Sequence, residues 1–287
     1  MSVTEAPSLP ATLGLGPVEI TVADLDRSLE FYERSLGLHL QRRDDSGAEL
    51  GDGDKTSVIL ALDPQARPAG RHAGLYHYAL LFPSREELAR TSVRLAAAGA
   101  PIQGASDHGS HEAIYLPDPD GNGIELAADR SPDQWITLEQ EFSRGGPQPL
   151  DVGALLATVA GEQPTAKVGP GLRVGHVHLH VGDIEQALAF YRDLIGLGVR
   201  FTMATAAFLA AGDYHHHLGV NTWQGEGVGP PEHSAGLRHW TIRLDTPAQV
   251  AEVRDRLEAA GADVEAAGGG FTVRDPWTTA LRIESAA

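Results

Sequence analysis

Short apolar runs and longer segments with a helical period alternate four times along the chain. An apolar run begins at Val18, and Leu25, Leu29, Tyr32 and Leu36 then recur at spacings of three to four residues. This spacing places apolar side chains along one face of a helix, whereas the short runs are typical of strands. We interpret these apolar and aromatic stripes as core rather than as a cofactor-binding element.

The pattern also repeats in sequence. Residues 18–25 match residues 177–184 at an offset of 159, and residues 75–80 match residues 237–242 at an offset of 162. An internal repeat of this kind indicates repeated structural units. The matches define four modules, near residues 14–63, 73–128, 173–223 and 236–285.

Each module has the same predicted order of elements. It begins with a strand, continues through an Asp, Ser or Thr suited to a helix N-cap, and then forms a helix. A glycine stands where each helix is expected to stop, at Gly37, Gly99, Gly196 and Gly261. Three short strands follow, so the predicted unit is βαβββ and the predicted fold class is α+β.

The segment 131–172 interrupts the repeat. It contains the helix breakers Ser131-Pro132 and Gly145-Gly146-Pro147, and between its breakers only Val152 to Val159 is expected to form a short helix. We therefore predict a first domain over residues 12–130 (modules 1 and 2), a linker over residues 131–172, and a second domain over residues 173–285 (modules 3 and 4).

Composition limits the chemistry and the partners. The 287 residues carry a formal charge of −17, which disfavours nucleic acid and anionic membranes as partners. The start of the chain lacks the basic and apolar regions of a signal peptide, and no cysteine is present, so a cytoplasmic location is expected. Any metal must be held by nitrogen and oxygen, and 13 histidines make such a site feasible.

The segment 106–126 contains the most specific motif. Ala113 to Leu116 and Ile124 to Leu126 are expected to be strands, and a turn rich in Asp, Pro and Gly separates them. Alternation places Glu125 on the opposite face from Ile124 and Leu126. Taken alone, the hairpin is explained by one solvated Glu; the neighbours of Glu125 in the motif point to function.

In order, the motif runs His108, Ile114-Tyr115, Asp118-Pro119, Gly121 and Glu125. It resembles the signature of the type I extradiol ring-cleavage dioxygenases in the vicinal oxygen chelate superfamily, although Ser106 is unusual for that signature. A catechol 2,3-dioxygenase-like branch is also matched by residues 175–181 and 212–221. The resemblance covers nearly the whole chain and implies four βαβββ modules that form two curved mixed sheets.

The resemblance also implies positions for metal ligands. Modules 1 and 3 offer Pro17 and His176 at equivalent positions. Module 2 offers His77 and Glu125, whereas module 4 offers His239 and Arg282. Only modules 2 and 3 together supply a complete set, His77, Glu125 and His176, so we infer that module 2 pairs with module 3 and module 1 with module 4.

A competing ligand set needs a different alignment of the last strand. A shift of two residues there would give His176, His239 and Glu284. Two imidazoles and one carboxylate on one face of an octahedral ion are typical of non-haem Fe(II), so Fe(II) is the expected cofactor. Mn, Zn or Ni could use the same ligands.

Other residues follow from the resemblance. His108 and Tyr115 match the active-site His and Tyr that bond the substrate oxygens. The run His215-His216-His217 is expected in the last strand of module 3, where His216 is the acid–base group on the face opposite His215 and His217. A weaker role in substrate binding is assigned to His215 and His217, and a surface histidine cluster is the alternative.

The predicted function is an Fe(II)-dependent extradiol dioxygenase, an oxidoreductase that opens a catechol-type ring with O₂. The expected partners are a small aromatic diol and O₂, with homo-oligomers possible in principle. One alternative is another metal-dependent enzyme of the superfamily, such as a glyoxalase-type isomerase or lyase. A further alternative is a metal-free protein that binds a small molecule.

Overall fold

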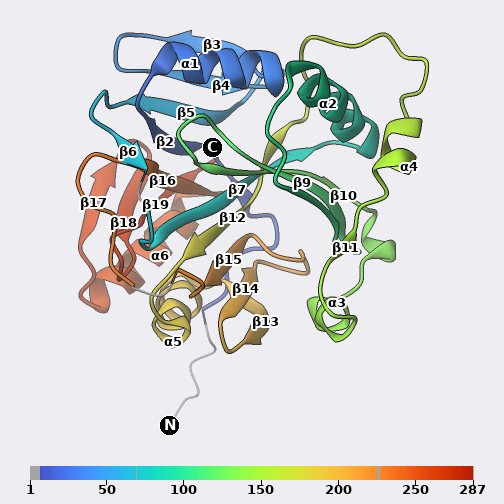
Figure 1. Cartoon of the computed structure of the whole chain (residues 1–287). Helices are drawn as coiled ribbons and strands as arrows, with labels where there is room; N and C mark the ends of the chain where they lie inside the picture. Colours follow the sequence, from blue (N-terminus) through green and yellow to red (C-terminus); the bar gives the residue numbers. More distant parts are fainter. Residues whose placement is uncertain (1–6, 69, 225–226, 287) are drawn as a thin grey trace.

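The computed structural model describes residues 7–68, 70–224 and 227–286. Two curved mixed sheets form the body of the molecule, and the helices flank them (Figure 1). No helix in these ranges is long and apolar enough to cross a membrane.

Each module has the predicted order of elements. Module 1 contains β2 (Val18–Val22), α1 (Leu25–Glu30) with its π-helical continuation η1 (Phe31–Ser35), β3 (His39–Arg43), β4 (Gly47–Gly51) and β5 (Thr56–Leu62). Module 2 contains β7 (Gly74–Phe82), α2 (Arg85–Ala98), β8 (Gly104–Asp107), β9 (His111–Pro117) and β10 (Gly123–Asp129).

The second half repeats this order. Module 3 contains β12 (Arg173–His180), α5 (Ile184–Leu188), η3 (Ala189–Ile195), β13 (Gly198–Met203), β14 (Ala206–Ala210) and β15 (Leu218–Asn221). Module 4 contains β16 (Ser234–Leu244), α6 (Pro247–Ala259), β17 (Val264–Ala267), β18 (Gly270–Arg274) and β19 (Ala280–Ser285). The α+β class and the βαβββ modules are confirmed.

The sheets combine modules from different halves of the chain. One has the order β17-β18-β19-β16-β2-β5-β4-β3, with the short strands β1 (Gly14–Leu15) and β6 (Arg67–Pro68) paired to β16. The other has the order β11-β8-β9-β10-β7-β12-β15-β14-β13, where β11 (Gln148–Pro149) comes from the linker. Modules 1 and 4 therefore share a sheet through β2 and β16, and modules 2 and 3 share a sheet through β7 and β12.

The helices connect the two modules within each half of the chain. Helix α2 contacts η1, and helix α6 contacts η3, so modules that follow one another in the chain touch through their helices. The helix N-caps are the predicted Asp, Ser and Thr residues, Asp24, Ser84, Asp183 and Thr246, whose side chains accept backbone hydrogen bonds. The predicted stripe of module 1, from Leu25 to Leu36, is buried in the core.

A tyrosine of each odd module holds the Asp-Pro turn of the next module. The Tyr32 hydroxyl donates to Asp118 at 3.1 Å, and the Tyr191 hydroxyl donates to Asp275 at 2.9 Å. Asp118 also accepts hydrogen bonds from the backbone N–H groups of Asp120 and Asn122. This carboxylate therefore shapes the turn that leads into β10.

The linker is more structured than predicted. Helix α4 (Val152–Ala157) lies within the predicted helical stretch, but η2 (Pro132–Gln134) and α3 (Leu138–Ser143) were not predicted. The capping box of Thr137 and Gln140 begins α3. Strand β11 joins the edge of the sheet of modules 2 and 3 at β8, so the linker is attached to that sheet.

Candidate metal centre and active site

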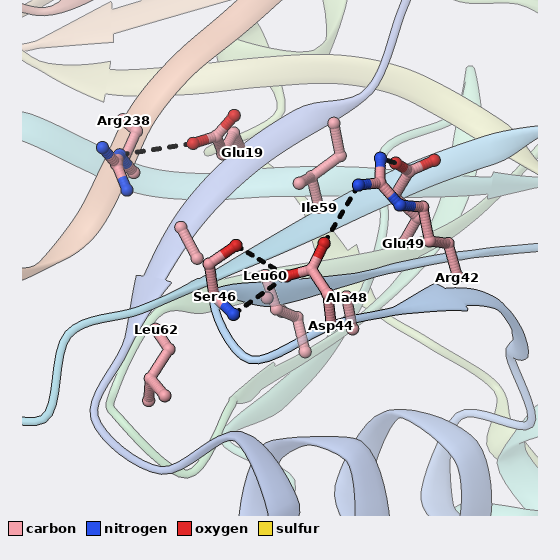
Figure 2. Close-up of a pocket in the computed structure, with 12 residues that line it drawn as sticks. Glu19, Arg42, Asp44, Ser46, Ala48, Glu49, Ile59, Leu60, Leu62 and Arg238 are labelled. Atoms are coloured by element: carbon pink, nitrogen blue, oxygen red, sulfur yellow. Dashed lines mark hydrogen bonds and ion pairs between the residues drawn. The ribbon is translucent and has the colours of Figure 1, made fainter.

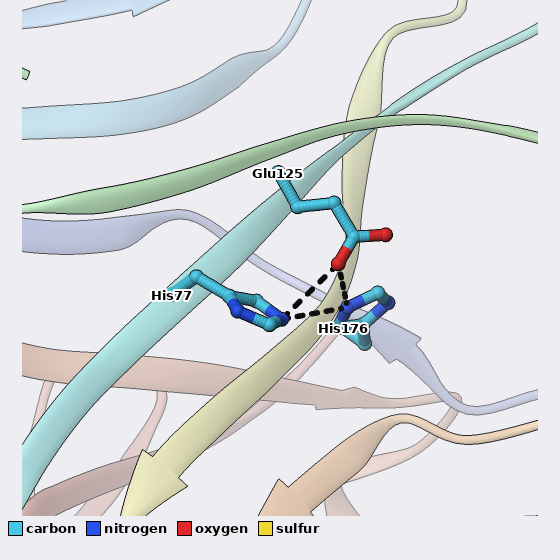
Figure 3. A group of neighbouring side chains, drawn as sticks. All are labelled: His77, Glu125 and His176. Atoms are coloured by element: carbon cyan, nitrogen blue, oxygen red, sulfur yellow. Dashed lines mark hydrogen bonds and ion pairs between the residues drawn. The ribbon is translucent and has the colours of Figure 1, made fainter. Parts of the chain in front are cut away.

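Three neighbouring strands bring His77, Glu125 and His176 together. They lie on β7, β10 and β12, which are adjacent in the order β10-β7-β12, and their side chains point toward one another (Figure 3). The Nε2 atoms of His77 and His176 are 3.3 Å apart, and each is 3.1 Å from Oε2 of Glu125. All three side chains are buried.

This geometry fits a metal ion. Ligand atoms about 2.1 Å from an octahedral ion and cis to one another are about 3 Å apart, close to the spacing of these three atoms. Within the described part of the chain, the buried Oε1 of Glu125 accepts no hydrogen bond of good geometry, although His111 Nε2 lies 3.1 Å from it. Glu125 therefore has a second oxygen with unshared electron pairs, on the side of His111, in addition to the Oε2 that faces the two imidazoles.

The protonation states suit ligands. Burial lowers the pKa of His77, and its hydrogen bond to Glu125 offsets this only in part. Burial raises the pKa of Glu125, but the charge of His176 and the close contacts with the imidazoles of His111, His176 and His77 hold the pKa well below its usual value. At neutral pH Glu125 is a carboxylate facing a neutral His77, as metal ligands require.

His108 and Tyr115 of the motif lie beside this centre. His108 Nε2 and the Tyr115 hydroxyl are 2.7 Å apart, and His108 Nδ1 is 2.7 Å from Oε1 of Glu141. Burial lowers the pKa of His108, but the hydrogen bond to Glu141 and the charges of Glu125 and Glu141 outweigh burial and raise it. Glu141 is buried on α3, and the sequence analysis missed it; the Thr137-x-x-Gln140 capping box was the available signal.

His111 is a second residue that the sequence analysis left without a role. Its ring stacks on His108 at 4.4 Å and on His215 at 4.8 Å between ring centroids. Burial and the charge of His108 lower the pKa of His111 to about 3. Strand parity was the available signal, because His111 lies on the same face of β9 as Tyr115.

The prediction that His215 to His217 belong to a strand is wrong. The three residues precede β15 in a turn, so strand alternation does not set their directions. The wrong expectation arose because the run was read as continuous with the apolar residues that follow it. The expected opposition of His216 to His215 is also absent, since their Nδ1 atoms are 2.9 Å apart.

The three histidines have different surroundings. His216 lines the cavity next to the centre, and its ring centroid is 4.3 Å from that of His176. His215 Nε2 is 3.1 Å from Oδ1 of Asp129, and Nδ1 of His217 accepts the backbone N–H of Ala211. All three are buried, so they do not form a surface cluster, and neither His215 nor His217 is among the residues that line the cavity.

A cavity of about 250 Å³ opens next to the three candidate ligands. The motif residues His108 and Tyr115 contribute to its wall. The other lining residues are Tyr76, Ser106, His111, Leu138, Glu141, Phe142, Pro147, His178, Phe208, His216 and Trp223. Tyr76 and Trp223 are 40% and 50% exposed, and their rings meet at 5.5 Å, so they border the entrance.

The competing ligands lie in the other sheet. His239 is on β16 and Glu284 on β19, whereas His176 belongs to the sheet of modules 2 and 3. His239 Nδ1 is 3.6 Å from Glu19, and Glu284 pairs with Arg243 and Arg282. The structure therefore does not bring the competing set together.

The sheet of modules 1 and 4 has a hollow of its own, of about 290 Å³ (Figure 2). Its charged side chains pair with one another: Arg238 with Glu19, and Arg42 with Asp44 and Glu49. Among the described residues, no histidine lines this hollow.

Comparison with known families agrees with the modules. The model of the Glyoxalase/Bleomycin resistance protein/Dioxygenase superfamily matches residues 14–126 and 173–280. The chain belongs to this superfamily. The two matched segments coincide with module pairs 1–2 and 3–4 and leave out the linker.

Proteins with different activities resemble the chain. Catechol-2,3-dioxygenase of Bacillus subtilis is 37% identical over 268 residues, which are 91% of this chain and 93% of that protein. Glutathione transferase FosA of Serratia marcescens is 32% identical over 114 residues, which are 39% of this chain and 78% of that protein.

Solved structures show the same fold. Glyoxalase I from Zea mays has a TM-score of 0.59 at 18% identity and covers 95% of this chain and 92% of that one. A provisionally assigned dioxygenase from Bacillus subtilis has a TM-score of 0.68 at 13% identity and covers 97% and 86%.

Proposed function

We propose that this protein is an extradiol dioxygenase that opens a catechol-type ring with O₂. The observation that carries the proposal is the convergence of His77, Glu125 and His176 beside a cavity lined by His108, Tyr115 and His216. The identity of 37% to a catechol-2,3-dioxygenase over nearly the whole chain supports the same activity.

The metal in this proposal is Fe(II), held by His77, Glu125 and His176. Two imidazoles and one carboxylate leave three adjacent coordination positions open, which distinguishes this set from closed structural sites. When bound, Fe(II) supplies positions for both substrate oxygens and for O₂, together with the electrons that activate O₂. Mn, Zn and Ni are the alternatives, because these nitrogen and oxygen donors do not themselves select one metal.

His216 is the proposed acid–base group, and its neighbours define its tautomer. The carboxylate of Asp129 accepts a hydrogen bond from His215 Nε2, so His215 Nδ1 is left as an acceptor. His216 Nδ1 then donates to His215 Nδ1. The remaining nitrogen of His216, Nε2, is unprotonated, a form that burial also favours because it lowers the pKa of His216, and it is the nitrogen that would take a proton from the substrate hydroxyl.

His108 and Tyr115 are the proposed contacts to the substrate oxygens. Glu141 accepts the proton of His108 Nδ1, which orients the imidazole toward Tyr115. With Nδ1 protonated, Nε2 accepts the hydrogen of the Tyr115 hydroxyl in the free protein. That hydroxyl can turn its hydrogen to a substrate oxygen, where it would stabilise developing negative charge.

The test is anaerobic purification, metal analysis and then addition of O₂ and catechol. We expect about one iron per chain, O₂ uptake equal to the catechol consumed, and a coloured ring-opened product that contains both oxygen atoms of ¹⁸O₂. Bound zinc or nickel with no O₂ uptake would instead support a glyoxalase-type isomerase or lyase. A protein with no metal and no turnover would be a binding protein.

A further inference from the structure

The outer wall of the cavity comes partly from outside the four modules. Helix α3 of the linker contributes Leu138, Glu141 and Phe142 to the lining. We propose that α3 makes the enzyme selective for catechols with an apolar, uncharged ring substituent and against catechols that carry a carboxylate. This inference rests on the proposed function and names its substrate class.

The apolar part of the wall is continuous across two elements. Phe142 of α3 lies 6.0 Å from Phe208 of β14 between ring centroids, and Phe208 lies 5.3 Å from His216. Phe142 is held in place by stacking on Phe201 at 4.9 Å with the rings nearly parallel. A substituent that leaves the catechol ring toward α3 therefore meets aromatic carbon, which favours apolar groups.

Among the described residues that line the cavity, a substrate carboxylate would find no unpaired cationic side chain, because His108 is already paired with Glu141. None of those described residues is Lys or Arg. His108 has both ring nitrogens engaged, one by Glu141 and one by Tyr115. His178 Nε2 is engaged by the amide of Asn221.

The one charged side chain that α3 contributes to the lining has the wrong sign for an anionic substrate. Glu141 is buried and faces the cavity beside His108. A substrate carboxylate would lose its water in an apolar site without gaining an ion pair, and a buried unpaired charge is strongly disfavoured. The net charge of −17 also lowers the local concentration of anions.

The position of α3 is well supported, so the wall is a fixed part of the site. The capping box of Thr137 and Gln140 starts the helix, and β11 pairs with β8 after it. The hydrogen bond between Glu141 and His108 also holds α3 against the segment that precedes β9. Selection by α3 therefore needs no movement of the linker.

The experiment compares three matched substrates on the iron-loaded enzyme. They are catechol, 3,4-dihydroxyphenylacetate and the methyl ester of that acid, which has a similar shape without the charge. We expect kcat/KM for the acid to be at least about 10²-fold below that of the ester, the scale on which a site rejects an unpaired buried polar group. The ester should be cleaved about as well as catechol.

Two variants test whether α3 is responsible. Phe142→Arg places a cation on the cavity wall, while the adjacent Glu141 stays bonded to His108. The variant should reduce the ratio of kcat/KM for the ester to kcat/KM for the acid by at least about 10-fold. Phe201→Arg loses the same aromatic stack and adds the same charge outside the lining, so it should leave this ratio unchanged.

The outcomes separate the two proposals. If wild-type enzyme cleaves the acid as well as the ester, or if both Arg variants reduce the ratio equally, the role of α3 is contradicted while ring cleavage stands. If catechol itself is not cleaved, the proposed function fails and the substrate class fails with it. The wild-type comparison remains decisive even if a variant does not fold.

Discussion

The two sheets of this protein have the same architecture, but within the described ranges only the sheet of modules 2 and 3 brings together a buried group of metal-ligating side chains. In the sheet of modules 2 and 3, His77 on β7 lies beside His178 on β12. In the sheet of modules 1 and 4, His239 on β16 lies beside Glu19 on β2 in the same register. The paired strands therefore have the same register in the two sheets, and the sheets differ in their side chains.

The third ligand position makes this plain. Glu125 pairs with the residue two positions after His77, and Arg282 pairs with the residue two positions after His239. Where Glu125 faces two imidazoles, Arg282 forms an ion pair with Glu284. A buried constellation of donors is thus a feature of particular residues on a repeated scaffold, and the fold alone does not supply it.

The largest effect is expected from substituting Glu125, the residue at the third ligand position. Glu125→Gln removes the carboxylate that holds the two imidazoles around an ion, so catechol-dependent O₂ uptake should fall by at least about 10³-fold. Arg282→Gln changes the equivalent residue of the other sheet and should leave O₂ uptake within about 2-fold, the behaviour expected away from the site. Equal losses in the two variants would show that the sheets are not functionally different.

A smaller loss is expected at His216. His216→Ala should keep its iron and lose turnover by about 10²–10⁴-fold, the range for one acid–base group. Iron content and O₂ uptake are measured on the same preparation. His217→Ala is the matched control, because His217 is adjacent in sequence but bonds the backbone of Ala211. A greater loss of turnover in His217→Ala than in His216→Ala would show that His216 is not the acid–base group.

The next effect in size is expected at Asp129, whose carboxylate bonds His215, the neighbour of His216. Asp129→Asn should lower kcat by about 10–100-fold with little change in KM, because an amide no longer fixes the tautomer of His215. Tyr214→Phe removes the other hydrogen bond to Asp129 and should have a smaller effect. A change confined to KM would contradict the positioning role of Asp129.

The smallest expected effects concern Asp118 and Asp275, the equivalent turn residues of the two halves. Burial raises the pKa of Asp275 to about 6. A folded-state pKa above the unfolded value means that the folded protein binds more protons between about pH 4 and pH 6, so the free energy of unfolding falls as the pH rises through this window. The free energy of unfolding changes by about 3 kcal/mol in total, because the pKa is raised by about two.

This contribution is measured as a difference from a variant. Asp275→Asn does not titrate, so the stability of the wild type relative to the variant should decrease from pH 4 to pH 7 in denaturant unfolding. Burial also raises the pKa of Asp118. Asp118→Asn should in addition weaken metal binding, because this turn leads into the strand that carries Glu125. No pH dependence in the difference for Asp275→Asn would contradict the burial of a protonated carboxyl group.

The modules were predictable from the sequence because their signals are local. Apolar spacing, cap residues and the repeat of residues 18–25 at 177–184 each point to one βαβββ unit. The pairing of module 2 with module 3 was inferred from Pro17 and Arg282, since neither can join a metal site. The observed sheet order agrees with that inference.

What the sequence analysis missed depends on contacts between distant segments. Glu141 reaches His108 from a linker helix of six residues, too short to stand out by periodicity. The role of Asp129 depends on a bond to His215 across 86 positions. The run from His215 to His217 was placed in a strand because no local signal separates a turn from the short strand that follows it.

The central claim is that the metal belongs to the sheet of modules 2 and 3. The most direct test is the iron content per chain of wild type, His77→Ala and His239→Ala, purified side by side under anaerobic conditions. The two variants remove equivalent histidines from the two sheets. We predict about one iron in the wild type, almost none in His77→Ala, and about one in His239→Ala. Iron retained in His77→Ala and lost from His239→Ala would contradict the account.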